Sequence, residues 1–214
     1  MVVALPVEII GIVRRNNPLV IFGERGAGKT TFMYQLWISL ISRGTDSALI
    51  TSYTSARTLY HMFHPRLDAG GRDIIVVDNH SIVDRVTALS HVLDALGVRD
   101  NVAILMDDMM PLEFLIAPKI STEMARIFSR LLFWLNYIAR ILKVLIVCSV
   151  PENISKMLPF KARFFASYGF NFIHIFHQAH FRELSLVDID ESTGTVKRSI
   201  FARAIISKNG FTFG

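Results

Sequence analysis

A glycine-rich octapeptide near the N-terminus has residues whose types and spacing could bind phosphate. The stretch GERGAGKT fits the pattern G-x-x-x-x-G-K-[ST], follows the apolar run 18–22, and opens a segment with helical spacing. Glycines let backbone N–H groups close around phosphates, and the start of a helix adds the positive end of its dipole. We therefore predict that nine residues bind a nucleotide: Gly23, Glu24, Arg25, Gly26, Ala27, Gly28, Lys29, Thr30 and Thr31.

Two aspartates that follow apolar runs are candidates for the carboxylate that such a loop needs to hold Mg²⁺. Asp78 follows Ile-Ile-Val-Val, and Asp107 follows Val-Ala-Ile-Leu-Met. We choose Asp107, together with the Thr30 hydroxyl, as the metal site, because Asp108 comes next and could orient or deprotonate an attacking water. The predicted catalytic residues are thus Asp108 and Lys29. The ammonium group of Lys29 is expected to reach the β- and γ-phosphate oxygens of the nucleotide. Asp78 is interpreted as capping a turn after a strand.

The elements that must position these residues follow from the pattern of apolar residues. Short apolar runs alternate with longer segments at helical spacing, and near-continuous Val, Ile and Leu runs are typical of strands buried on both faces. We therefore predict an α/β fold with a mostly parallel central sheet flanked by helices. Turn signals at 192–194 and 209–210 predict antiparallel hairpins near the C-terminus. Expected strands are 18–22, 47–51, 73–77, 101–106, 144–148, 170–176, 184–189, 196–206 and 211–213, and expected helices are 29–43, 55–63, 82–96 and 122–142, the last capped by Ser121.

Composition restricts the class of protein. The chain has 214 residues, 51% hydrophobic and 19% charged, with a mean hydropathy of +0.40, which excludes intrinsic disorder and predicts a single domain over residues 1–214. A net charge of +5 permits an anionic partner without requiring one. The longest uncharged window, 164–181, contains three histidines, so no membrane insertion is predicted. The N-terminus lacks the pattern of a secretory signal, and we expect a cytoplasmic protein whose one cysteine, Cys148, forms no internal disulfide.

Together these features resemble the RecA/RadA/KaiC superfamily of P-loop ATPases, in particular small archaeal single-domain members. The resemblance rests on GERGAGKT, on the 78 residues from Lys29 to Asp107, on the strand KVLIVCSVPE after a long helix, and on the closing hairpins. It implies a RecA-like core that binds ATP and Mg²⁺ between subunits of a homo-oligomer, a ring or a filament. The family's catalytic glutamate follows the second strand, where this chain reads ALITSYTS, and its sensor follows the fifth, where Ser149 offers only a hydroxyl. We therefore expect weak or partner-dependent hydrolysis.

The segment 151–168 is long for a connection and interleaves cations with aromatic rings, a mixture that suits single-stranded nucleic acid. Loops after the fourth and fifth strands bind DNA in RecA-like proteins, so the resemblance favours a DNA recombination or repair accessory factor. The DNA-binding candidates are Lys156, Lys161, Arg163 and Phe164. Alternatively, part of the segment is an amphipathic helix whose phenylalanines lie in the core. The alternative function is that of a KaiC-like regulatory protein, as in archaeal motility motors, which binds ATP with little hydrolysis and has a protein partner.

Lys208, near the C-terminus, lies where the family often places a basic residue that reaches a neighbouring subunit's γ-phosphate. Arg198 and Arg203 are further candidates for this trans-acting role. A lysine that is simply solvated on an edge hairpin is the alternative interpretation. Two tryptophans, Trp37 and Trp134, lie on apolar helix faces and are expected in the core.

Overall fold

The computed structural model describes residues 4–52, 74–77, 82–97, 101–110, 121–153, 158–159, 162–178, 180–190, 196–207 and 209–214. The elements within these ranges are α1 (Val7–Arg15), β1 (Leu19–Gly23), α2 (Lys29–Ile41), β2 (Asp46–Ser52), β3 (Ile74–Val77), α4 (Ile82–Leu96), β4 (Val102–Met106), α6 (Thr122–Ile141), β5 (Leu145–Asn153), β6 (Leu158–Pro159), α7 (Ala162–Ser167), β7 (Asn171–Gln178), β8 (Phe181–Ile189), β9 (Val196–Ser207) and β10 (Gly210–Phe213). The expected helix at 55–63 lies outside the described residues, and α1 is a helix that the sequence analysis did not predict.

The strands form one mixed sheet in the order β10-β9-β8-β7-β1-β5-β4-β2-β3, with β6 paired to the end of β5. Strands β1 to β5 and β7 run parallel to their neighbours in the central part, while β8, β9 and β10 continue antiparallel. The predicted α/β class, with a parallel core and antiparallel strands near the C-terminus, is confirmed. Because the carboxyl ends of parallel strands share one edge of a sheet, the loop after β1 and the aspartates after β4 meet there.

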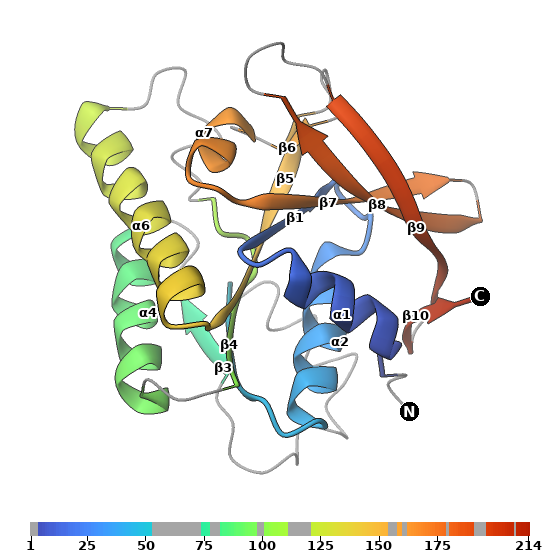
Figure 1. Cartoon of the computed structure of the whole chain (residues 1–214), viewed down its shortest axis with the longest axis horizontal. Coiled ribbons are helices and arrows are strands. Elements are labelled where there is room, and N and C mark those ends of the chain that lie inside the picture. Colours follow the sequence, from blue (N-terminus) through green and yellow to red (C-terminus); the bar gives the residue numbers. More distant parts are fainter. Residues whose placement is uncertain are drawn as a thin grey trace.

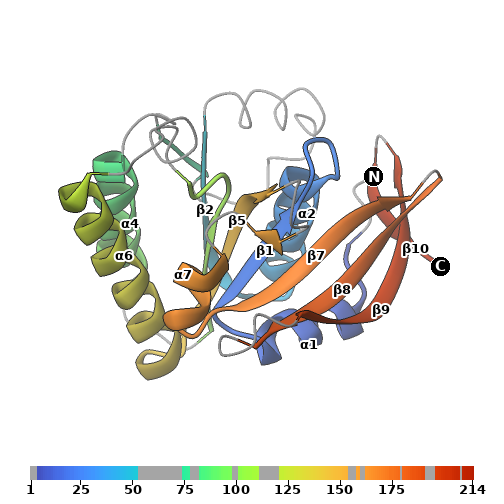
Figure 2. The same ribbon diagram turned by 90° about the horizontal axis from the view of Figure 1, so that it is seen from above.

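Helices cover the central strands on both faces (Figures 1 and 2). On one face, residues of α1 and α2 form a buried cluster with Leu19 and Ile21 of β1, and on the other face residues of α4, α6 and α7 form a second buried cluster that includes Val20 and Phe22. Every residue of β1 is buried, as the continuous apolar run predicted. No helix in the described part of the chain is long and apolar enough to cross a membrane.

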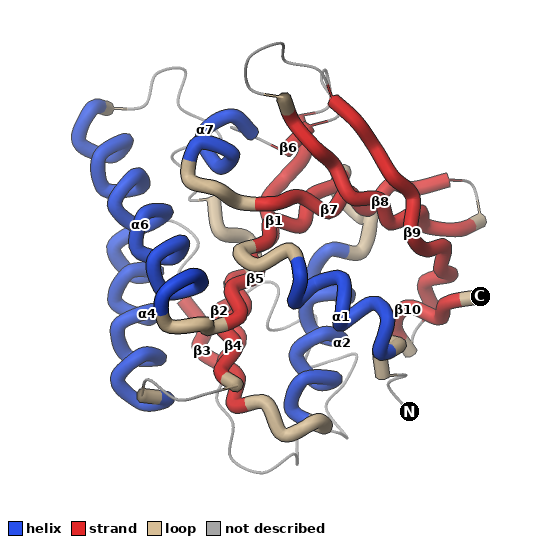
Figure 3. The backbone as a smooth tube through the Cα atoms, viewed as in Figure 1, coloured by secondary structure: helices blue, strands red, loops and turns tan. Residues whose placement is uncertain are grey.

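The antiparallel strands lie at the end of the sheet away from α4 and α6 (Figure 3), and β10 is attached to α2, the helix that follows the glycine-rich loop. The buried amide of Gln35 accepts a hydrogen bond from the backbone N–H of Phe211 at 2.8 Å and donates one to its carbonyl at 2.9 Å. The side chain thus pairs with the outer edge of β10 as a neighbouring strand would. This contact places the C-terminal strands beside the loop between β1 and α2.

The long helix α6 buries a narrower stripe than its sequence suggested. Ser121 caps it as predicted, accepting a hydrogen bond from the backbone N–H of Met124 at 3.2 Å. Trp37 on α2 is buried as expected, but the prediction for Trp134 is wrong, because its side chain is 55% exposed. At 100° per residue, Trp134 lies beyond the margin of the buried stripe, on the same outer surface of α6 as the exposed Phe133 and Tyr137.

Candidate functional site

Two glycines shape the loop between β1 and α2. A Cβ atom on Gly23 would lie 2.3 Å from the backbone carbonyl oxygen of Ile175, so only glycine lets β7 approach β1 this closely. Gly28 precedes the first residue of α2 with a φ of +101°, and a Cβ there would lie 2.3 Å from Cδ1 of Ile206. The pattern G-x-x-x-x-G is therefore required by both backbone conformation and packing.

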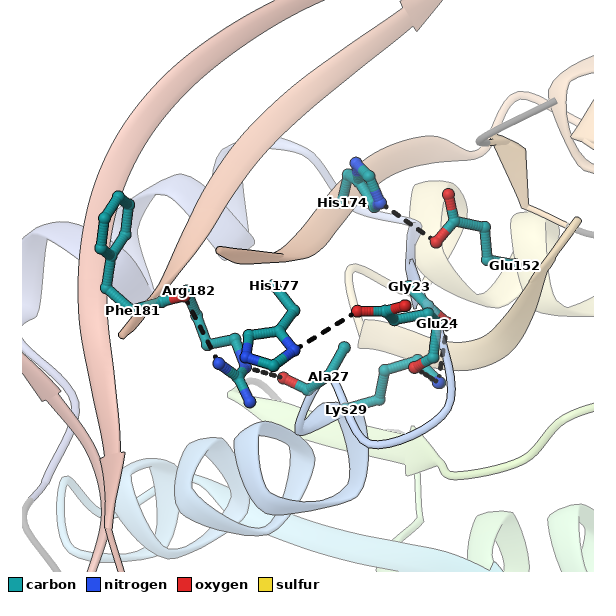
Figure 4. Close-up of polar contacts among 9 residues, drawn as sticks. All are labelled: Gly23, Glu24, Ala27, Lys29, Glu152, His174, His177, Phe181 and Arg182. Carbon is teal, nitrogen blue, oxygen red and sulfur yellow. Dashed lines mark hydrogen bonds and ion pairs between the residues drawn. The ribbon is translucent and has the colours of Figure 1, made fainter. Parts of the chain in front are cut away.

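Lys29 opens α2 and lies across the mouth of this loop (Figure 4). Its ammonium group donates hydrogen bonds to the carbonyl oxygens of Gly23 at 2.9 Å and Glu24 at 3.0 Å. Burial lowers the pKa of the amine, while Asp108 and Asp107 oppose that effect. The predicted phosphate-binding cation and the predicted acidic pair are thus close enough to interact electrostatically.

Asp107 follows β4 and is almost completely buried. Its Oδ1 accepts a hydrogen bond from the Ser149 hydroxyl at 2.6 Å and its Oδ2 one from Thr51 at 3.4 Å, while the Thr30 side chain also hydrogen-bonds the carboxyl group. Burial, followed by repulsion from Asp108, raises the pKa of Asp107 to about 6. The structure thus joins Thr30 and Asp107, the two predicted metal ligands, in an oxygen-rich site. Such donors fit Mg²⁺; the competing candidate Asp78 lies outside the described residues.

Asp108 has a φ of +51° and borders a cavity above the loop. Its backbone N–H donates to the Ser149 hydroxyl at 2.9 Å, so that hydroxyl links both aspartates. Ser149 itself is fully buried and does not line the cavity. Its role as a γ-phosphate sensor stays a prediction, since its hydroxyl hydrogen is donated to Asp107.

The cavity measures about 420 Å³, within the size range of small-molecule sites. It brings together six predicted loop residues with Asp108 and with two residues from the antiparallel strands. Its lining consists of Arg25, Gly26, Gly28, Lys29, Thr30, Thr31, Asp108, Arg182 and Ile206. Sequence reasoning missed Arg182 and Ile206, because their place depends on how β8 and β9 fold back on β7.

Arg85 is a second cation that sequence reasoning missed. It lies on α4 and is completely buried, with its guanidinium coupled electrostatically to Asp108 and Asp107. Burial lowers its pKa and the two carboxylates raise it. Arg85 occupies the buried stripe of α4 at helical spacing from Ala88 and Leu89, so the apolar periodicity contained a signal for an inward-facing arginine.

A buried acid–histidine pair lies beside the first turn of the loop (Figure 4). His174 on β7 is 1% exposed, stacks on Phe22 at 4.5 Å, and places its Nε2 3.3 Å from Oε2 of Glu152. Burial, followed by the charge of Arg198, lowers the pKa of His174 to about 4, so the imidazole is neutral at pH 7. Burial also raises the pKa of Glu152, whose carboxyl group hydrogen-bonds the backbone of Glu24. The pair therefore supports the loop from the neighbouring strands β5 and β7.

The proposed DNA-binding segment is described only in part, because Lys156 and Lys161 lie outside the described residues. Arg163 is exposed on α7. Phe164 stacks on Phe128 of α6 at 5.8 Å, and Phe165 is completely buried against the same ring. The phenylalanines of α7 thus contact the core, which is the packing named as the alternative to base stacking.

Among the predicted trans-acting cations, Lys208 lies outside the described residues. Arg203 donates from Nε to Oε1 of Glu183 at 3.0 Å, and its guanidinium lies 5.4 Å from the centre of the Phe181 ring. Arg198 is exposed on β9. Their action on a neighbouring subunit stays a prediction.

Comparison with known proteins supports the fold. No protein-family model matches the chain, and a search of curated proteins finds no match. Among solved structures, a KaiC-like protein from the hyperthermophilic archaeon Pyrococcus horikoshii OT3 superposes with a TM-score of 0.63 and 16% identity, over 92% of this chain and 88% of that one. The likeness extends over most of both chains, and it shows that this chain shares the overall fold of the KaiC-like protein.

Proposed function

We propose that this RecA-like chain binds Mg-ATP at the loop 23–31 and hydrolyses it weakly or only with a partner. The observation that carries the proposal is a single cavity in which Lys29 and Thr30 face Asp108, with Asp107 buried below. Backbone N–H groups at the start of α2 would bind the phosphates, and Lys29 would add a positive charge.

Thr30 and Asp107 are the residues that would hold Mg²⁺, which neutralises charge on the phosphate oxygens when it is bound with the nucleotide. Asp108 borders the cavity and is the carboxylate that would orient or deprotonate water. Strand β2 ends in Thr51 and Ser52. Both residues carry hydroxyl groups, whereas the resemblance to RecA-like proteins predicts a catalytic glutamate near the end of this strand. Because the proposal assigns the role of base to Asp108 without a glutamate after β2, it predicts slow hydrolysis of ATP.

We extend the proposal to a homo-oligomer, a ring or a filament, that contacts single-stranded DNA. In this arrangement Lys208 would reach a neighbour's nucleotide, and the segment 151–168 would contact DNA. Since Phe164 is packed on Phe128, the segment would bind mainly through cations, so its affinity should fall steeply with salt. Changing Lys156, Lys161 and Arg163 together to alanine should weaken single-strand binding and reduce the salt slope; unchanged affinity and slope would exclude this surface.

A second candidate function, nucleotide-gated binding of a protein partner, is favoured by the outer surface of α6. Phe133, Trp134 and Tyr137 are 56%, 55% and 41% exposed, and their rings contact edge to face at 6.5 and 5.8 Å. Arg130 and Arg126 are exposed about one and two turns earlier, respectively, on the same helix. Tryptophan, tyrosine and arginine are the residues most enriched at energetic centres of interfaces. The positive charges beside the rings favour a partner segment that is apolar and acidic.

ATP binding and turnover by the purified chain, with and without single-stranded DNA, test both candidates. Lys29→Ala is the control, because loss of the cation should abolish nucleotide binding and expose any contaminating ATPase. Turnover stimulated by DNA supports the first candidate, and tight binding without turnover supports the second. Absence of ATP binding by the wild-type chain would overturn the proposed site.

A further inference from the structure

Arg182 approaches the phosphate loop from the antiparallel half of the sheet (Figure 4). It lies on β8, opposite His177 of β7, and its Nε donates to the carbonyl oxygen of Ala27 at 3.3 Å. The same side chain lines the cavity together with Gly26, Lys29 and Asp108. A cation that is far away in the sequence thus reaches the loop within one chain.

The charge of Arg182 has no carboxylate partner in the part of the chain that the structure describes. Its two hydrogen bonds go to neutral backbone carbonyls, those of Ala27 at 3.3 Å and Phe181 at 3.4 Å. Arg203, on the adjacent strand β9, instead pairs with Glu183 at 3.0 Å. A guanidinium has five N–H donors, so the two long contacts leave most of its donors available beside the cavity.

We propose that Arg182 is a phosphate-binding residue of this site, supplied in cis by β8. The inference rests on the proposed nucleotide binding and extends it by a second fixed cation, besides Lys29, within the same subunit. A guanidinium group can donate two parallel hydrogen bonds to phosphate oxygens, and this interaction is strongest where no carboxylate competes for the same donors. The ligand is therefore the polyphosphate chain of the nucleotide, rather than its base.

The position of Arg182 is set by elements that are themselves attached to the loop. β8 is paired along its length with β7 and β9. His177, its partner across the β7–β8 pair, places Nδ1 3.5 Å from Oε1 of Glu24. The guanidinium therefore needs no neighbouring subunit to reach the cavity, in contrast to the trans-acting role predicted for Lys208.

Binding of ATP and of inorganic tripolyphosphate, measured by calorimetry with Mg²⁺ present, tests the assignment. Arg182→Gln should weaken both ligands by about 10- to 100-fold, as expected for loss of a charge-assisted contact. Arg182→Lys, which keeps the charge but loses the planar fork, should show a smaller loss. Arg15→Gln is the control, because it removes the same charge from an exposed position on α1, outside the cavity. Thermal unfolding of each variant checks the fold.

Each outcome decides between the alternatives. Weaker binding of both ligands by Arg182→Gln, with Arg15→Gln unchanged, supports the assignment. Unchanged ATP affinity in Arg182→Gln overturns the assignment. A loss of affinity confined to ATP also overturns it, because it would indicate contact with the base. An equal loss in Arg15→Gln overturns it as well, because it would indicate a general effect of net charge. If Arg182→Gln does not fold, unchanged affinity in Arg182→Lys overturns a bidentate contact. If the wild-type chain binds neither ligand, the proposed nucleotide site itself fails.

Discussion

Lowering the pH from 7 to 5 perturbs His174, the buried histidine beside the glycine-rich loop 23–28. In the folded chain His174 stacks on Phe22 and contacts Glu152, and burial, followed by the charge of Arg198, lowers its pKa from 6.5 to about 4. The unfolded chain therefore takes up this proton near pH 6.5, whereas the folded chain does so only near pH 4. Because the unfolded state binds more protons in this interval, the free energy of unfolding falls as the pH drops through it.

With these two pKa values, His174 removes about 2 kcal/mol of stability between pH 7 and pH 5. That loss is a large fraction of the roughly 5–15 kcal/mol by which domains are stable. Glu152 acts in the opposite direction, because burial raises its pKa, and the folded chain then holds its proton at a pH where the unfolded chain has lost it. A variant at His174 that leaves Glu152 in place separates the two contributions.

Urea unfolding of the wild-type chain and of His174→Gln at pH 7, 6 and 5 measures the effect. Glutamine does not titrate, yet its amide can still donate to Glu152. The wild-type chain should lose about 2 kcal/mol more than the variant between pH 7 and pH 5, with equal denaturant slopes. Parallel losses in the two proteins would refute a neutral His174 in the folded state.

Three further variants test the loop and its supports. Gln35→Ala should lower the free energy of unfolding by about 2–4 kcal/mol in urea titrations, since it leaves both backbone groups of Phe211 unpaired in a buried place; a loss below 1 kcal/mol would contradict this. Gly28→Ala should weaken ATP binding at least about tenfold in calorimetry through positive φ and collision with Ile206; wild-type affinity would exclude that strain. Asp108→Asn should reduce ATP turnover about 100-fold or more while ATP affinity stays within about threefold; normal turnover would show that Asp108 is not the base.

Local signals explain why much of the fold was predictable. The helix predicted at 82–96 is α4 with the same bounds, and the cap at Ser121 forms as expected. The loop GERGAGKT connects a buried strand to a helix, as its pattern requires. Each of these features depends on residues within a few positions of one another, where turn chemistry and periodicity act directly. The predicted metal ligands Thr30 and Asp107 also meet, although they are far apart in the sequence, because the loop that leads to Thr30 follows β1, Asp107 follows β4, and both strands are parallel members of one sheet.

Contacts between residues that are far apart in the sequence could not be predicted from such local signals. The contact between Arg182 and Ala27 joins residues 155 positions apart, and it requires both the hairpin between β7 and β8 and its register. A shift of one residue would turn Arg182 to the other face of the sheet. The sequence analysis did not predict the exposure of Trp134 for another reason. Apolar residues surround more of the circumference of α6 than the core can bury. The sequence pattern therefore does not identify which of these residues face the core.

The glycine-rich loop 23–28 is therefore positioned by more than its own strand and helix. Strand β7 contributes the carbonyl of Ile175 beside Gly23 and the side chain of His177 beside Glu24, while Ile206 packs against Gly28. Because these contacts join the loop to β7 and β9, we expect that a ligand that moves the loop also shifts these strands, and that a partner bound to the strands changes nucleotide affinity in return. Such reciprocity is what a protein needs if nucleotide state is to control its association.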